Sequence, residues 1–221
     1  MALEIPKSWT FKNDWVARNF DTHVREQLPW YDCLTELVAV LAKHFLPEGA
    51  RGYDVGASTG NVGASLEDVI KARNVEWTGI DNSEKMLGFY RAPGKLEIFD
   101  AIDFPFKSFD LMVCFLSIMF MPVEKRKRWL EKMFFERLKV GGAIIVVDRE
   151  QPEEGAVSTA LARSVWLLKK KAGATSEDIF RKEMSLCGVQ RPIPKDFFDG
   201  LPAREFFRFG DFAAWIIEKR E

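Results

Sequence analysis

The chain has 221 residues, of which 47% are apolar and 29% are charged, and its formal net charge is −1. This composition is that of an ordinary globular protein with a sizeable core, and it excludes a chain drawn to nucleic acid or to an anionic membrane by its overall charge. The longest apolar run, residues 111–123, is interrupted by Ser117 and Pro122 and is too short to span a bilayer.

The cysteine and histidine content argues against a disulfide framework and against a structural metal. The number of cysteines is odd, and no two of them form a C-x-x-C pair; they are Cys33, Cys114 and Cys187. Only two histidines, His23 and His44, can supply an imidazole group. The opening residues, "MALEIPKSWT", show no basic-then-apolar secretory pattern. We therefore expect a cytoplasmic protein without a metal site and without a membrane partner.

Helices and strands are predicted from the hydrophobic pattern along the chain. Residues 10–46 predict an N-terminal helical cap of two helices separated by "QLPWYD". From residue 50 onward, short apolar runs alternate with helical patterns, which indicates βαβ units and a parallel sheet. The predicted strands span about 51–56, 75–80, 96–99, 109–116 and 142–148, and the predicted helices lie near 60–72, 83–90 and 122–138.

The C-terminal third adds a second helical pair and a hairpin. Residues 157–188 predict two helices that separate at "AGATSED", where Thr175 or Ser176 is a suitable cap. The run "REFFRFGDFAAWIIEKR" predicts an antiparallel hairpin over residues 203–219. We therefore predict a single α/β domain over residues 1–221, with a mostly parallel sheet that ends in this hairpin.

The stretch "YDVGASTGNVG", residues 53–63, fits two patterns that predict different chemistry. Gly56 to Gly60 matches G-x-S-x-G, the turn that presents a nucleophilic serine in hydrolases. Such a hydrolase needs a histidine after the serine, and both histidines of this chain precede Ser58. Ser58 is therefore not expected to be a nucleophile.

The second interpretation is a strand-to-helix turn that holds a nucleotide-like cofactor. A dinucleotide site needs glycine where Ser58 stands, which disfavours a nicotinamide dehydrogenase. Asp54 repels a pyrophosphate but suits a cofactor with an ammonium or sulfonium charge. Asp81 follows the second strand, where a carboxylate can accept both ribose hydroxyls, and Asp100 follows the third. Three acids in this order predict a ligand crevice at the carboxyl ends of the strands.

Four motifs, "YDVGASTGN", "GIDNSEKML", "FDAIDFPFKSFDLMVCFL" and "LKVGGAIIVVD", resemble class I S-adenosylmethionine-dependent methyltransferases. The resemblance covers residues 50–148, the predicted cofactor-binding core. It implies a Rossmann-like seven-stranded sheet with an antiparallel last strand, and S-adenosyl-L-methionine as cofactor. In that family the glycine loop passes the methionine part, and the next two acids hold the ribose and the adenine. The implied cofactor-binding residues are Asp54, Gly56, Ala57, Ser58, Gly60, Asp81, Asn82, Met86, Asp100 and Ala101.

Further segments resemble one branch of that family, the branch that contains carboxy-S-adenosylmethionine synthase and serves modification of a tRNA wobble uridine. These segments are "FDTHVREQLPWYD", "MFMPVEKRKRWLEKM" and the 157–188 pair. A tyrosine of that branch contacts the cofactor, which implies Tyr31. An asparagine of the branch corresponds to Cys114, and the arginine that holds the added carboxyl group falls on Glu183. The architecture of the branch is supported, whereas its reaction is not.

The leading prediction is methyl transfer to an unidentified acceptor, either a small molecule or tRNA. Carboxy-S-adenosylmethionine synthesis and a non-catalytic cofactor-binding regulatory role are the alternatives. Methyl transfer from a sulfonium needs alignment of the reactants more than it needs acid–base groups. Asp148, after the fifth strand, is the predicted base or acceptor-orienting carboxylate, and Tyr31 is the second catalytic candidate. Ser117, Met119 and Arg149 are further candidates near the methyl group.

Two surface features leave partners open. The basic runs "EKRKR" (residues 124–128) and "KKK" (residues 169–171) fit a tRNA contact or, more simply, solvated helix faces. Residues 157–188 are expected to act as a lid or to form the contact of a homodimer.

Overall fold

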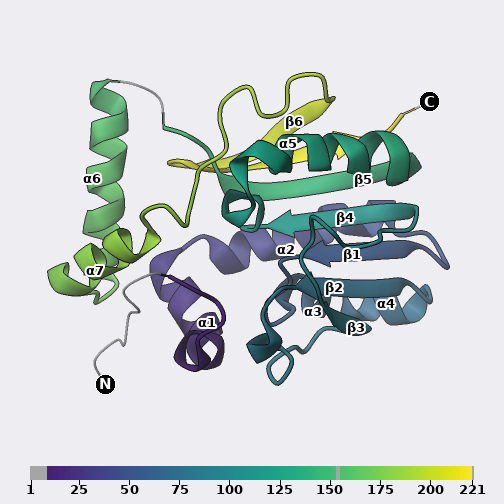
Figure 1. The fold of residues 1–221 in the computed structure, drawn as a ribbon, viewed down its shortest axis with the longest axis horizontal. Helices are drawn as coiled ribbons and strands as arrows, with labels where there is room; N and C mark the ends of the chain where they lie inside the picture. The colour runs from purple at the N-terminus through teal and green to yellow at the C-terminus, as the bar shows by residue number, and fades with distance from the viewer. Residues whose placement is uncertain (1–8, 153–154, 221) are drawn as a thin grey trace.

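A seven-stranded sheet forms the centre of the computed structural model, which describes residues 9–152 and 155–220 (Figure 1). The strands are β1 (Arg51–Val55), β2 (Glu76–Asp81), β3 (Lys95–Ile98), β4 (Phe109–Phe115), β5 (Leu138–Arg149), β6 (Ala203–Phe209) and β7 (Phe212–Glu218). Their order is β3-β2-β1-β4-β5-β7-β6, and β7 alone runs antiparallel to its neighbours. The predicted α/β sheet with a C-terminal hairpin is confirmed. Residues 1–8, which include most of the stretch "MALEIPKSWT", lie outside the described residues.

Helices precede and connect these strands. They are α1 (Asp14–Gln27), α2 (Tyr31–Ala42), α3 (Asn61–Ser65), α4 (Glu67–Ala72), α5 (Val123–Lys132), α6 (Ala156–Lys171) and α7 (Ser176–Leu186), with the 3-10 turns η1 (Lys43–Phe45), η2 (Glu84–Met86) and η3 (Ile118–Phe120) and the π turn η4 (Met133–Arg137). Thr175 caps α7 as predicted, because its hydroxyl accepts a hydrogen bond from the Asp178 amide at 3.0 Å. No helix within residues 9–152 and 155–220 is long and apolar enough to cross a membrane.

Two predicted helices differ from the structure. The helix near 60–72 is broken at Leu66, a fully buried residue whose ψ of 3° interrupts the helical backbone between α3 and α4. The helix near 83–90 is reduced to η2, because Gly88 and the following "RAPG" favour a turn over further helix. β5 also begins earlier than predicted, at Leu138.

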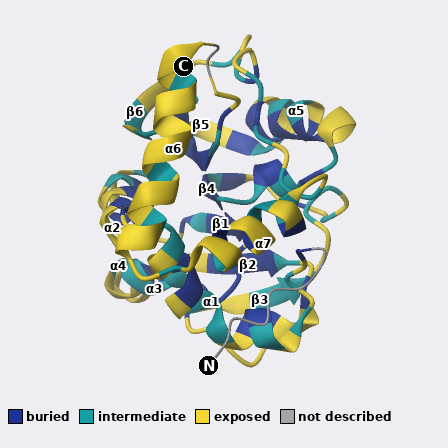
Figure 2. Ribbon diagram, turned by 90° about the vertical axis from the view of Figure 1, so that its left-hand side faces the viewer, coloured by how far each residue is buried: buried dark blue, intermediate teal, exposed yellow. Residues whose placement is uncertain are grey.

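The sheet separates two hydrophobic clusters because successive strand residues point to opposite faces. In β4, Leu111 and Val113 belong to the cluster with α2, α3 and α4, whereas Met112 and Cys114 belong to the cluster with α5. All four are fully buried, as the dark central strands of Figure 2 show. With both faces covered, the ends of the strands are where the sheet can meet a ligand.

α1 and α7 lie at the end of the sheet toward which β1 and β4 point, and α6 stands apart from the sheet (Figure 1). α6 contains no buried residue, and Val157 and Trp166 are 68% and 49% exposed. α7 buries Lys182 and Ser185 instead, and Ser185 accepts a hydrogen bond from the Trp9 amide at 2.8 Å. The homodimer through residues 157–188 stays a prediction.

Candidate functional site

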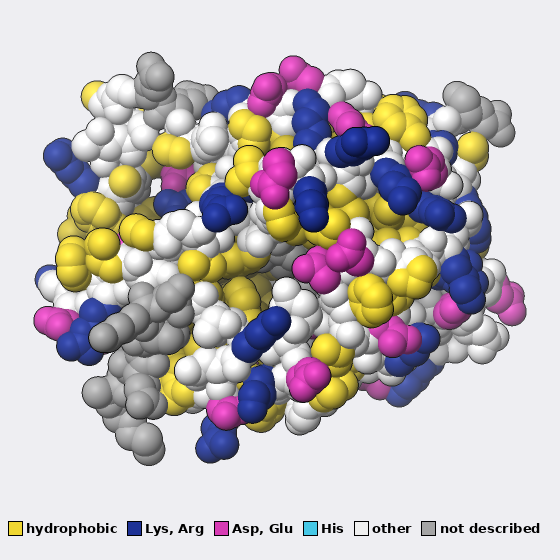
Figure 3. Space-filling model, viewed as in Figure 1, with side chains coloured by type: hydrophobic (Ala, Val, Ile, Leu, Met, Phe, Trp, Pro, Cys, Tyr) yellow, Lys and Arg dark blue, Asp and Glu magenta, His cyan; other side chains and the backbone are white. Residues whose placement is uncertain are grey.

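A cavity of about 350 Å³ opens at the carboxyl ends of β1, β2 and β4, and residues of α1, α6 and α7 form its opposite wall. The face drawn in Figure 3 is hollowed near its centre, where hydrophobic side chains gather. The predicted site residues that line the cavity are Tyr31, Asp54, Gly56, Ala57, Ser58, Asp81, Asn82, Asp100 and Ala101. The sheet topology therefore brings most of the predicted residues to one cavity.

The loop after β1 approaches the cavity through three residues in the left-handed region. Gly56, Ser58 and Gly60 have φ values of 73°, 49° and 81°. At Gly56 a Cβ atom would lie only 2.5 Å from Cβ of Ser117, so only glycine fits there. The glycine pattern of the sequence thus reflects both the backbone conformation and close packing against the segment after β4.

Asp81 holds this loop against the end of β2. Its Oδ2 accepts a hydrogen bond from the Ser58 amide, and its Oδ1 accepts one from the Ser83 amide, each at 2.9 Å. Burial raises the pKa of Asp81, and the two amide bonds oppose that shift. Because each carboxylate oxygen has a second lone pair, Asp81 can still accept from two ligand hydroxyls.

Asp54 is a buried acid without a partner on one oxygen. It is 2% exposed, and its Oδ2 has no hydrogen-bond partner among the described residues. Burial, together with the charge of nearby Asp81, raises the pKa of Asp54 to about 7. A cationic ligand group in the cavity would favour the ionised form of the Asp54 carboxyl group. Asp54 is therefore the residue of the site that would attract an ammonium group electrostatically.

The third acid lies in a more exposed part of the cavity. Asp100 Oδ1 accepts a hydrogen bond from the Ile102 amide at 2.9 Å, which fixes the turn after β3. Ala101 and Phe99 line the cavity beside it, and Phe99 is 43% exposed. An exposed aromatic ring next to a carboxylate suits a flat heteroaromatic group that carries an amino substituent.

Two predicted cofactor residues, Gly60 and Met86, do not line the cavity. Met86 is fully buried, and its sulfur accepts a hydrogen bond from the Ser58 hydroxyl at 3.5 Å. At Gly60 a Cβ atom would lie 2.8 Å from the Tyr90 ring. Both residues therefore support the loop from behind, and their contact with the cofactor stays a prediction.

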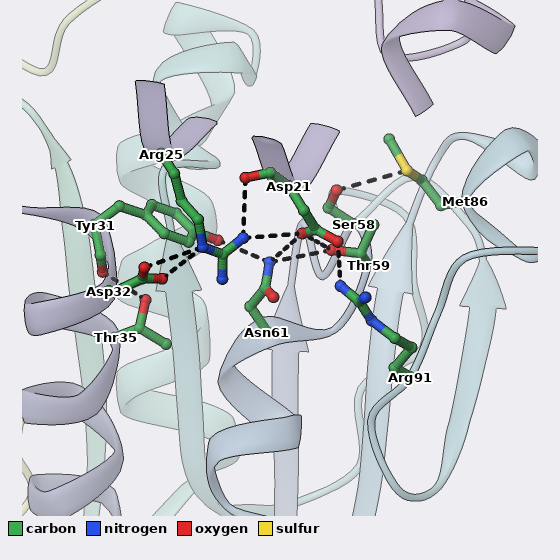
Figure 4. Close-up of polar contacts among 10 residues, drawn as sticks. All are labelled: Asp21, Arg25, Tyr31, Asp32, Thr35, Ser58, Thr59, Asn61, Met86 and Arg91. Carbon is green, nitrogen blue, oxygen red and sulfur yellow. Dashed lines mark hydrogen bonds and ion pairs between the residues drawn. The ribbon is translucent and has the colours of Figure 1, made fainter. Parts of the chain in front are cut away.

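Tyr31 lies at the cavity through a polar network that the sequence analysis missed (Figure 4). The Asn61 amide donates to the Tyr31 hydroxyl at 3.1 Å and to Asp21 Oδ1 at 2.9 Å. The Thr59 hydroxyl also donates to Asp21 Oδ1, at 2.7 Å, and Arg91 forms an ion pair with Asp21. Asp21 of α1 thus ties the N-terminal helices to the glycine loop. No local sequence pattern marks it, because its partners lie far along the chain.

Asp148 does not line the cavity, although the sequence predicted it as a base there. It is fully buried, and its two oxygens accept hydrogen bonds from the Met119 amide at 3.1 Å and the Arg149 amide at 2.8 Å. Burial raises the pKa of Asp148 to about 7, although these hydrogen bonds act to lower it. Its geometry is that of a clamp between β5 and the turn after β4, and its role as a base stays a prediction.

The other candidates from the sequence do reach the cavity. Ser117, Met119 and Arg149 all line it, and the Ser117 hydroxyl is buried without a hydrogen-bond partner among the described residues. Arg149 forms a salt bridge with Asp211 at 2.9 Å and donates to Gln190 at 2.7 Å. Its charge is therefore already matched within the protein.

Comparisons with known proteins agree with this geometry. Residues 53–142 match the family model described as "Methyltransferase domain". The carboxy-S-adenosyl-L-methionine synthase of Staphylococcus epidermidis is 29% identical over 193 residues, which cover 85% of this chain and 84% of that protein. The synthase of Wolinella succinogenes is 27% identical over an alignment of 233 positions, which covers 99% of this chain and 96% of that protein.

Solved structures resemble the fold. The plantazolicin methyltransferase BpumL has a TM-score of 0.60 at 13% identity, with 93% of this chain and 89% of that chain covered. Human N-acetylserotonin methyltransferase has a TM-score of 0.58 at 13% identity, with 96% of this chain and 58% of that chain covered. Together the comparisons confirm the predicted resemblance to S-adenosylmethionine-dependent methyltransferases and the Rossmann-like fold.

The first prediction concerns Ser58. We expect Ser58→Ala to retain most of its cofactor affinity and activity, because the Ser58 amide rather than its hydroxyl bonds to Asp81. Mass spectrometry after treatment with a fluorophosphonate probe should find no label on Ser58. Stoichiometric labelling at this residue would contradict the cofactor interpretation and would favour a hydrolase.

The second prediction concerns the buried Asp54. Because its folded-state pKa is raised from 3.8 to about 7, its ionisation destabilises the folded protein as the pH rises through this window, by up to about 4 kcal/mol above pH 7. We expect Asp54→Asn to have a higher free energy of unfolding than the wild type at pH 8, and a similar one near pH 4. Urea unfolding at both pH values measures this difference, and an equal difference at both would refute it.

Proposed function

We propose that this protein binds S-adenosyl-L-methionine and transfers its methyl group to an acceptor bound in the same cavity. The observation that carries the proposal is the set of three acids, Asp54, Asp81 and Asp100, around one cavity beside a glycine loop. The match of residues 53–142 to the methyltransferase domain supports it.

The residues of the cavity fit the parts of this cofactor. The unpartnered Asp54 carboxylate suits the ammonium of the methionine part, next to the glycine loop. Asp81 has lone pairs for the two ribose hydroxyls. Asp100, with Phe99 and Ala101, suits the adenine. When bound, S-adenosylmethionine supplies a methyl group that its sulfonium charge has already activated.

The chain's own task is then to align the acceptor and to exclude water. Asp148 is held by backbone amides and has no role as a base in this proposal. Tyr31 acts through its place in the Asp21 network, where Asn61 fixes its hydroxyl. Burial raises the pKa of Tyr31 above its usual range, so its hydroxyl stays protonated and donates rather than abstracts a proton.

Carboxy-S-adenosylmethionine synthesis is the second candidate, because relatives at 25–29% identity carry that name. The sequence argument against it was a glutamate, Glu183, in place of a carboxyl-binding arginine. Glu183 does line the cavity, but it forms a salt bridge with Lys169 at 3.0 Å. Because this pair is neutral, the repulsion of an added carboxyl group is smaller than an isolated glutamate would cause. Methyl transfer stays the leading proposal, since no arginine stands at that position.

We also propose that the protein works in the cytoplasm. Cys33, Cys114 and Cys187 are all unpaired, which suits a reducing compartment. A tRNA acceptor stays a prediction. It is not favoured by the "EKRKR" run, because Arg126 is buried there and donates to the backbone carbonyl of Pro192 at 2.9 Å.

The third prediction is that Asp81→Ala weakens binding of S-adenosylhomocysteine by about 100-fold or more, because each lost charge-assisted hydrogen bond contributes about 1.5–3 kcal/mol. Titration calorimetry measures the affinity. Asp103→Ala is the matched control, because Asp103 is exposed and lies outside the cavity. Unchanged affinity in Asp81→Ala, with the variant folded, would refute the ribose assignment.

The fourth prediction separates the two proposed reactions. With S-adenosylmethionine and prephenate as carboxyl source, we expect mass spectrometry to find no carboxylated cofactor at catalytic turnover. The reason is that the residue at that position is Glu183, a carboxylate that already pairs with the Lys169 ammonium at 3.0 Å. Formation of the carboxylated cofactor over many turnovers would promote the synthase reaction to the leading function.

A further inference from the structure

The cavity extends beyond the acids into a region lined by aromatic and basic side chains, which we call the basic lobe. Its residues come from the segment before α1, from α1 and from the α6–α7 pair. They are Trp9, Trp15, His23, Trp166, Lys169 and Lys182. None of these is needed to explain how the three acids bind a cofactor.

Lys182 is the central residue of the basic lobe. It is 8% exposed, and its ammonium nitrogen lies over the Trp9 ring. Among residues 9–152 and 155–220, no oxygen accepts a hydrogen bond from Lys182, since the neighbouring Glu183 carboxylate is bonded to Lys169 at 3.0 Å. A buried lysine without an acceptor is unfavourable unless a ligand supplies one.

Other polar atoms that line the cavity also lack partners. Both ring nitrogens of His23 and Oε1 of Gln27 are buried without a hydrogen bond to any described residue. The His23 ring stacks on Trp9, with centroids 5.5 Å apart. Burial, together with Lys182 and Lys169, lowers the pKa of His23 to about 3, so this ring offers one N–H donor and one acceptor. Several unmatched polar atoms at the wall of one cavity indicate a polar group of a ligand.

We propose that the basic lobe is the acceptor site and that it takes a small, planar, apolar compound with one carboxylate, which Lys182 holds. This inference rests on the proposed function, because it names the acceptor of the same transfer. The aromatic rings of Trp9, Trp15 and Trp166 suit a flat apolar body. The carboxylate is single because Lys169 and Arg149 are already paired with Glu183 and Asp211.

Protonation of Lys182 is coupled to this binding. Burial, together with the Lys169 ammonium, lowers the pKa of Lys182 to about 5, and Glu183 opposes the shift. From α1, the uncharged His23 faces it as well. At pH 7 the free amine is therefore mostly neutral, and a bound carboxylate raises its pKa again. Carboxylate binding near pH 7 then takes up a proton, and it weakens as the pH rises.

The fifth prediction tests the basic lobe with 2-naphthoate, a planar probe with one carboxylate, and with 2-naphthamide as its neutral counterpart. Titration calorimetry is done with S-adenosylhomocysteine bound, since that cofactor product carries no carboxyl group at its sulfur. We expect the wild type to bind naphthoate about tenfold or more tightly than naphthamide. Lys182→Met should lose this preference and keep naphthamide binding. Lys171→Met, which removes an exposed lysine of α6, should keep the preference.

The outcomes separate this inference from the proposed function. Equal affinities for naphthoate and naphthamide in the wild type, an unchanged preference in Lys182→Met, or no binding of naphthoate would each overturn the acceptor site. Binding of S-adenosylhomocysteine is titrated by itself, and the naphthoate titrations are repeated without it. A failure of S-adenosylhomocysteine to bind then refutes the cofactor proposal alone. Buffers of different ionisation enthalpy measure the proton uptake, which should be present in the wild type and absent in Lys182→Met.

Discussion

Two buried carboxylates on neighbouring strands determine most of the geometry of the site. Asp54 is the buried penultimate residue of β1, Asp81 ends β2, and these strands pair in parallel. Asp81 accepts a hydrogen bond from the Ser58 amide of the glycine loop, whereas one oxygen of Asp54 has no hydrogen-bond partner among the described residues. The repulsion between the two acids and their burial disfavour the empty cavity with both ionised. A cation that binds in the cavity offsets this repulsion. Part of the free energy of binding a cationic ligand therefore comes from the two buried carboxylates.

The glycine loop is held from two directions. Asp81 fixes the Ser58 amide from the sheet, and Asp21 fixes Thr59 and Asn61 from α1. The same Asn61 bonds to the Tyr31 hydroxyl at the start of α2 (Figure 4). The N-terminal helices are therefore connected by hydrogen bonds to the loop that follows β1. These hydrogen bonds hold a loop in which three residues have left-handed backbone conformations.

The sequence predicted the sheet and the acids at its carboxyl edge because both follow from local patterns. Apolar runs mark strands buried on both faces, and Asp54, Asp81 and Asp100 each come at a strand end. The same reasoning did not show that Asp148 lies outside the cavity lining, because the position along a strand does not reveal which way a side chain points. Arg149, one residue later, reaches the cavity instead. Asp21 was missed for a different reason: its bond to Thr59 spans 38 positions, and only the packing of α1 brings the two together.

An ion pair also changes the electrostatic effect of a charged residue on a ligand, and the sequence does not reveal which residues form such pairs. Glu183 stands where the resemblance implies an arginine, yet Lys169, 14 positions earlier on the other helix of the α6–α7 pair, neutralises it. The cavity consequently has opposite electrostatic characters in its two parts, with unmatched acid at the strand ends and unmatched lysine at the helical wall. A cationic methyl donor and an anionic acceptor would be oriented toward each other by this polarity. Alignment of the two reactants, which such a transfer needs most, then depends on where the fold leaves its ionisable side chains without hydrogen-bond partners.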